Sequence, residues 1–139
     1  MSDASEMTPI SAKRTAYVLV SLLGAVAILH AYWALGGTWG LQIAVGAGNP
    51  LPPPIASAAV TFLLIGATLV VLGRVGMWGE SVPAWLFRWG TWVLCVVLIA
   101  VAVMNFTTGR PWERWGFAPF AALLAALAAA VARSRGRAV

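Results

Sequence analysis

The sequence predicts an all-α integral membrane protein, a single four-helix bundle with both termini in the cytoplasm. Four long apolar stretches fill most of the 139 residues. Apolar residues make up 61% of the chain and charged residues 9%, whereas a soluble domain carries about 25% charged residues. The stretches are too long for strands and lack a period of two, so helices are the expected spanning structure.

The first two elements are a tail and a span. Residues 1–15 are polar and predict a flexible cytoplasmic tail. Residues 16–35 predict the first span, since about 20 helical residues cross a hydrocarbon core of about 30 Å. Lys13 and Arg14 precede this run as in a signal peptide, but the apolar core of a signal peptide has only about 7–15 residues. We therefore expect a retained span.

The next two spans follow a loop rich in glycine and proline. Residues 36–54 carry no charge, and the prolines at 52–54 cannot continue a helix but can start one. Residues 55–73 predict the second span. A loop with Pro83 then leads to the third span, over residues 85–106.

The fourth span is the shortest. Residues 117–132 are nearly all alanine and leucine, which suits close helix packing. A start nearer Trp115, or a locally thinner bilayer, would accommodate its length. Residues 133–139 predict a basic cytoplasmic tail.

The basic residues predict the orientation of the four-helix transmembrane domain, residues 16–132. With the N-terminus in the cytoplasm, seven basic residues lie inside and only Arg110 and Arg114 lie outside, as the positive-inside rule requires. The seven are Lys13, Arg14, Arg74, Arg88, Arg133, Arg135 and Arg137. This distribution explains the net charge of +5 without nucleic-acid binding. The eight tryptophans divide between the two interfaces as aromatic belts.

Cysteine and metal chemistry find little support in the sequence. Cys95 is the only cysteine, so no intrachain disulfide forms, and it is expected to be a small buried hydrophobic residue. One histidine, one cysteine and two carboxylates outside the tail do not make a metal site. We expect no metal and no cofactor.

His30 is the main candidate for a functional residue. It lies about 7–8 Å below the outer interface, at the edge of a small-residue face formed by Gly24, Ala27, Ala31 and Ala34. A histidine within a span needs a partner, so it is a functional hypothesis by default. A structural hydrogen bond to a neighbouring helix or loop is the alternative.

Other candidates lie on the same outer side. Glu113 could pair with His30 as acid and base, which makes these two the candidate catalytic residues. A solvated loop with weak ion pairs is the alternative for Glu113 and Arg114. The candidate ligand-binding residues are Trp33, Trp39, Asn105, Arg110, Trp112 and Arg114, since aromatic faces can hold a cationic or flat apolar ligand.

Residues 30–40, HAYWALGGTWG, resemble the histidine–tryptophan–double-glycine signature of the domain-of-unknown-function 3995 family. The later Trp112-Glu113-Arg114, followed by a fourth span with an early proline, is also similar. Members are small bacterial membrane proteins with four predicted spans and no assigned activity. The resemblance therefore implies the architecture and highlights His30, Trp33, Gly36, Gly37, Trp39 and Gly40, but it implies no mechanism.

Three functions remain open. The first is a membrane protein with an outer-leaflet pocket for a lipophilic small molecule around His30, with catalysis left undecided. The second is a small transporter or exporter, which is disfavoured because no carboxylate lies within a span to couple protons. The third is an accessory subunit whose alanine-rich fourth span packs on another membrane protein, or on a second copy of the chain. The composition fits a bacterium with a GC-rich genome, so the expected location is the bacterial inner membrane.

Overall fold

A computed structural model describes residues 9–46 and 50–134 of the chain. The helices are α1 (Pro9–Ala34), α2 (Leu41–Val45), α3 (Pro54–Arg74), α4 (Ala84–Thr107), η1 (Glu113–Phe117) and α5 (Ala118–Arg133). No strand occurs in these two described ranges. The predicted all-α fold is therefore confirmed, and the short helix α2 adds an element within the loop expected over residues 36–54.

Within residues 9–46 and 50–134, four helices are long and apolar enough to cross a membrane, as predicted. They cover Ile10–Ala34, Pro54–Arg74, Ala84–Thr107 and Glu113–Arg133. The fourth has 21 residues because η1 continues directly into α5, so its length needs no thinning of the bilayer.

The start of this fourth span is a π-helical turn, and Pro119 explains it. Proline has no N–H to donate to the carbonyl four residues earlier, so a regular α-helical ladder is interrupted at this point. The N–H of Ala118 instead donates to the carbonyl of Glu113, five residues back, which is the π-helical pattern. The turn thus joins the loop to α5 without ending the helix.

The prediction of a tail over residues 1–15 is wrong for residues 9–15. Residues 9–15 form the first two turns of α1, and residues 1–8 lie outside the described ranges. A proline suits a first helical turn, and the buried Ala12 extends the packing face of α1 beyond the span predicted over residues 16–35. At the other end Arg133 belongs to α5, Ser134 follows it, and the rest of the predicted basic tail is not described.

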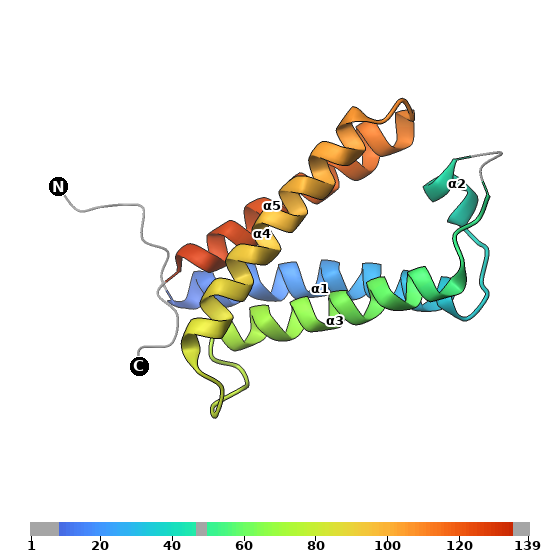
Figure 1. Cartoon of the computed structure of the whole chain (residues 1–139). Helices are drawn as coiled ribbons and strands as arrows, with labels where there is room; N and C mark the ends of the chain where they lie inside the picture. The colour runs from blue at the N-terminus through green and yellow to red at the C-terminus, as the bar shows by residue number, and fades with distance from the viewer. Residues whose placement is uncertain (1–8, 47–49, 135–139) are drawn as a thin grey trace.

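The helices form two arms arranged as a V (Figure 1). One arm is α1 packed against α3, and the other is α4 packed against α5. The arms meet where α1 begins and α5 ends, which we call the closed end. They separate toward the opposite end, which carries α2 and η1 and which we call the open end.

The closed end holds the core. A cluster of buried residues joins α1, α3, α4 and α5, and its members from α1 all precede Gly24. Small residues of α5 (Ala125 and Ala128) allow the helices to approach closely. Arg74, the last residue of α3, donates hydrogen bonds from Nη2 to the carbonyls of Ala132 and Ser134, which ties α3 to the end of α5.

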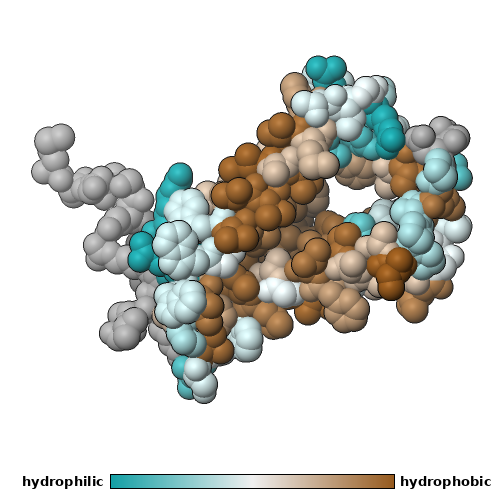
Figure 2. All heavy atoms as spheres, viewed as in Figure 1, coloured by the Kyte–Doolittle hydropathy of each residue, from teal (hydrophilic) through white to brown (hydrophobic). Residues whose placement is uncertain are grey.

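The surface is divided as a membrane protein requires. Figure 2 shows a hydrophobic belt across the middle of the molecule, with hydrophilic groups gathered at the closed end and at the tips of both arms. The same view shows an opening between the arms at the open end. The arms therefore present apolar surface to each other where they do not touch.

Candidate functional site

The signature residues fold into a tight corner at the end of α1. The Trp33 indole Nε1 donates a hydrogen bond of 2.8 Å to the carbonyl of Trp39, and the N–H of Trp39 lies 3.5 Å from the Tyr32 hydroxyl oxygen. Gly36 and Gly40 adopt φ values of 92° and 74°, which favour glycine. We call His30, Tyr32, Trp33 and Trp39 the aromatic corner.

Gly37 has a separate reason to be glycine. Its backbone runs directly beneath the ring of Tyr32, and a Cβ at this position would overlap that ring. The absence of a side chain lets the loop fold back onto α1. Glycine is therefore favoured at both positions, by the turn at Gly36 and by the close contact at Gly37.

Within the aromatic corner, His30 packs against Trp33. Its ring lies edge-on to the Trp33 ring, with centroids 4.9 Å apart and an interplanar angle of 78°. The side chain is partly buried, and within the described residues its Nδ1 has no hydrogen-bond partner. His30 therefore contacts the indole that fixes Trp39, rather than a second polar group.

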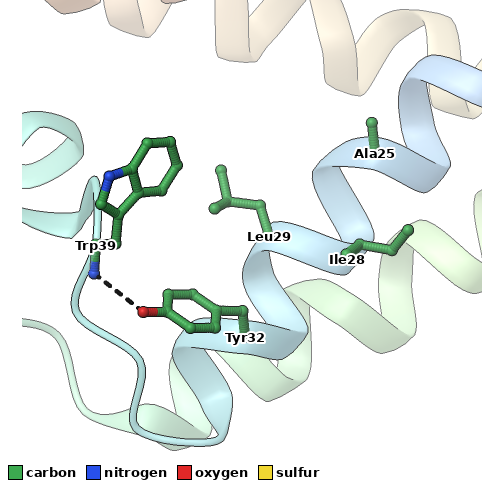
Figure 3. Close-up of a pocket in the computed structure, with 5 residues that line it drawn as sticks. All are labelled: Ala25, Ile28, Leu29, Tyr32 and Trp39. Carbon is green, nitrogen blue, oxygen red and sulfur yellow. Dashed lines mark hydrogen bonds between the residues drawn. The ribbon is translucent and has the colours of Figure 1, made fainter.

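An apolar groove of about 480 Å³ lies on α1 beside this corner. Its lining consists of Ala25, Ile28, Leu29, Tyr32 and Trp39. In Figure 3, Ala25 and Leu29 project from α1 toward the other arm, and the Trp39 indole stands beside Leu29. Trp39 is 77% exposed although its backbone is held at two points.

His30 is not among the residues that line this groove. Each helical residue turns by about 100°, so His30 points well away from its neighbour Leu29 and shares a face with the buried Ala27. The groove and the histidine thus occupy different faces of α1. The residues Ala25, Ile28 and Leu29 were absent from the sequence prediction, although with Tyr32 they have the spacing of one helical face.

The remaining candidates lie on the other arm. The Arg110 Nη1 donates to Glu113 Oε1 at 2.6 Å, and the Glu113 side chain is 11% exposed. The Arg114 guanidinium lies over the rings of Phe106 and Trp115, at 5.0 and 5.7 Å from their centroids. This arm therefore has its own ion pair and its own cation–π contacts.

The two sets of candidates are not joined. Asn105 Nδ2 donates to the carbonyl of Val101 in its own helix at 2.8 Å, and Trp112 is exposed. Within the described ranges, no hydrogen bond links His30 with Glu113, whose carboxylate is paired with Arg110. The structure thus groups His30, Trp33 and Trp39 on one arm and groups Arg110 with Glu113 on the other.

Gly24 and Cys95 also occupy defined positions. A Cβ at Gly24 would meet no atom within 4 Å, so Gly24 does not form a close helix contact, contrary to the small-residue face expected for α1. The buried Cys95 thiol lies 3.5 Å from the Ala125 carbonyl and links α4 with α5. No group of three or more metal-ligating side chains occurs in the part of the chain that was searched, residues 9–46 and 50–134.

The chain was compared with known proteins. Residues 23–128 match a family model described as "Protein of unknown function (DUF3995)". The match includes the aromatic corner, the groove and most of both arms. No curated protein and no solved structure matches the chain.

Proposed function

Because this chain belongs to the domain-of-unknown-function 3995 family, whose description assigns no activity, we propose a function from its own geometry: it binds the hydrocarbon chain of a lipophilic ligand in the α1 groove. The observation that carries this proposal is the groove itself, an open apolar recess formed by α1 and the loop that follows it, on a side of α1 that faces the other arm. Trp39 forms its border.

The size and chemistry of the groove fit such a ligand. Its volume falls within the range of about 300–1,000 Å³ that small-molecule sites occupy. The lining side chains are apolar except for the indole N–H of Trp39 and the hydroxyl of Tyr32, which lies 3.5 Å from the backbone N of Trp39. From Ala25 to Tyr32 the groove follows about 10 Å of helix. A hydrocarbon segment meets these conditions better than a polar substrate.

In this proposal His30 positions the border of the groove and does not touch the ligand. It packs against Trp33, and Trp33 in turn holds the carbonyl of Trp39. The proposal includes no acid–base step, since His30 and Glu113 are not hydrogen-bonded to each other in the described structure.

The two alternative functions have less support. A transport path would have to reach both ends, and the buried cluster fills the closed end. The accessory-subunit hypothesis began from the small residues of α5, and several of these already pack inside the protein (Ala121, Ala125 and Ala128). Binding in the groove uses a surface that remains accessible.

We further propose a bacterial inner-membrane location with the closed end in the cytoplasm, as the basic residues there predict. The test is to introduce cysteine in place of exposed Trp39 or exposed Arg133 and to label intact spheroplasts with an impermeant maleimide. Labelling of the Trp39→Cys protein alone supports this orientation. Labelling of the Arg133→Cys protein alone reverses it.

The groove is tested by filling it. Ala25→Leu places a larger side chain inside the groove, and Ala100→Leu makes the same change at an exposed position of α4. Each protein is reconstituted with palmitoyl-oleoyl phosphatidylcholine, transferred to detergent, washed and analysed by native mass spectrometry. We expect the wild type and the Ala100→Leu protein to retain bound lipid and the Ala25→Leu protein to lose most of it.

Equal lipid retention by all three proteins would contradict the proposal. Melting temperatures measured in the same detergent show whether each variant is folded. A loss of lipid with the Ala100→Leu protein as well would assign retention to the general surface rather than to the groove.

A further inference from the structure

The tip of the second arm holds an arginine between two aromatic rings. Arg114 lies in η1, and its guanidinium carbon is 5.0 Å from the centroid of the Phe106 ring and 5.7 Å from that of the Trp115 ring. The ring centroids are 6.5 Å apart and the rings are inclined at 78°, so they form two walls beside the guanidinium. Phe106 comes from the end of α4 and Trp115 from η1. We call Phe106, Arg114 and Trp115 the Arg114 cluster.

The hydrogen-bond donors of Arg114 are available to a ligand. Within residues 9–46 and 50–134, no carboxylate or carbonyl accepts a hydrogen bond from its guanidinium, and the carboxylate of Glu113 is paired with Arg110. A phenyl or indole ring offers no oxygen or nitrogen acceptor, so the ring contacts do not use these donors. Arg114 therefore differs from Arg74, whose Nη2 already donates to two carbonyls.

Other polar side chains at this tip have partners within it. Asn105 Nδ2 donates to a carbonyl within α4, and the hydroxyls of Thr107 and Thr108 donate to carbonyls in the last turn of the same helix. Residues 105–117 contain two arginines and one glutamate, which leaves a net charge of +1. An incoming anion therefore meets one cation that is not neutralised by a carboxylate of this tip, Arg114.

The Arg114 cluster lies where the apolar helices end. Arg114 is the second residue of the apolar helix Glu113–Arg133. Its side chain is exposed, as are those of Trp112 and Trp115. Figure 2 shows hydrophilic groups at the tip of this arm, beyond the hydrophobic belt. Tryptophans at the end of an apolar helix are typical of the headgroup level of a bilayer, which both lipid headgroups and dissolved anions reach.

We propose that Arg114 binds an oxyanion, a phosphate or a carboxylate, at the open end and at a site separate from the groove on α1. A guanidinium forms paired, charge-assisted hydrogen bonds with such an anion. The contacts with Phe106 and Trp115 hold the guanidinium in place, so less side-chain freedom is lost when the anion binds. The anion belongs either to a phospholipid headgroup or to a dissolved ion, and the two sources are separated below.

The test compares two lipids that have the same chains and different headgroups. The purified full-length protein in detergent receives an equimolar mixture of dioleoyl phosphatidylglycerol and dioleoyl phosphatidylcholine. Native mass spectrometry gives the ratio of the two lipids in the complex with one bound lipid, and we expect the wild type to favour phosphatidylglycerol. Arg114→Gln should lower this ratio about fivefold. Arg133→Gln removes the same charge from an exposed position at the closed end and should lower it less than about twofold.

Two further comparisons separate a defined site from a simple charge. Arg114→Lys keeps the charge but removes the planar guanidinium, and we expect the ratio to fall about threefold. Phe106→Leu keeps Arg114 but removes one ring, and we expect a fall of about twofold. Phe62→Leu makes the same change at an exposed position of α3 and should leave the ratio unchanged. Melting temperatures in the same detergent show whether each variant is folded.

Inorganic phosphate identifies the source of the oxyanion. If phosphatidylglycerol stays bound to the wild type at millimolar phosphate, the ligand is a lipid headgroup. If phosphate displaces phosphatidylglycerol from the wild type more readily than from the Arg114→Gln protein, the same site takes a dissolved anion. Equal displacement from both proteins would contradict a site at Arg114.

Equal decreases with Arg114→Gln and Arg133→Gln would overturn the proposal, because they would indicate a diffuse field in place of a site. A wild-type ratio for the Arg114→Lys protein would also overturn it. Arg114 does not line the groove, so Ala25→Leu should lower the total amount of bound lipid without changing the ratio. Failure of the groove and failure of the Arg114 site are therefore distinguishable.

Discussion

The contact of Gly73 with Phe87 sets how α3 and α4 meet at the closed end, and it gives a sharp stability prediction. A Cβ at Gly73 would overlap the Phe87 ring. The ring cannot easily move, because it is 6% exposed, it makes an edge-on contact with Trp78 at a centroid distance of 5.7 Å, and it also lies against Gly79. Gly73→Ala therefore has to separate the two helices or force Phe87 from its position.

The expected cost follows from overpacking of a buried contact. Such substitutions destabilise by about 1–3 kcal/mol. Gly66→Ala is the matched control, because Gly66 lies in the same helix and a Cβ there would meet no atom within 4 Å. The change in helix propensity from glycine to alanine is common to both variants, so the difference between them isolates the clash.

The free energy of unfolding is measured in mixed micelles by titration with sodium dodecyl sulfate, followed by circular dichroism. We expect Gly66→Ala to equal or slightly exceed the wild type and Gly73→Ala to fall about 1–3 kcal/mol below Gly66→Ala. If the Gly73→Ala protein is as stable as the Gly66→Ala protein, the packing argument for the junction of the arms is wrong.

Two further predictions concern the arms. Trp33→Phe keeps an aromatic ring but removes the hydrogen-bond donor to the Trp39 carbonyl. We expect the free energy of unfolding to fall by about 0.5–1.5 kcal/mol and the loop after α1 to be cleaved faster by protease. Unchanged proteolysis would show that this hydrogen bond does not hold the loop. Glu113→Gln weakens the ion pair with Arg110, whose side chain is 46% exposed. We expect the free energy of unfolding, measured in the same titration, to fall by less than about 1 kcal/mol. A larger decrease would show that the pair is shielded from water.

The helices could be read from the sequence because a bilayer imposes a strong local rule. Each of the four helices had to be long, apolar and fully hydrogen-bonded within itself, and all four were predicted. The predictions were wrong at positions where a helix extends beyond its apolar segment. Residues 9–15 are polar but helical, and the fourth span begins in a π-helical turn four residues before its predicted start at Phe117.

The candidate site was predictable only in part. Histidine and tryptophan identified the aromatic corner, because such residues are conspicuous in an apolar chain. Ala25, Ile28 and Leu29 gave no such signal, since an apolar helical face reads the same whether it faces lipid, a neighbouring helix or a groove. The pairing of Glu113 with Arg110 likewise depends on how the second arm folds at its tip.

The sequence by itself determined that the chain forms four helices long and apolar enough to cross a membrane and that basic residues gather at one end of them, because chain length, hydropathy and charge are properties of each segment alone. Only the tertiary structure decided that the helices pair into two arms, that the arms touch at one end, and that His30 points away from the groove. These features depend on the angle at which helices pack and on which face of each is covered, and side chains distant in sequence fix both.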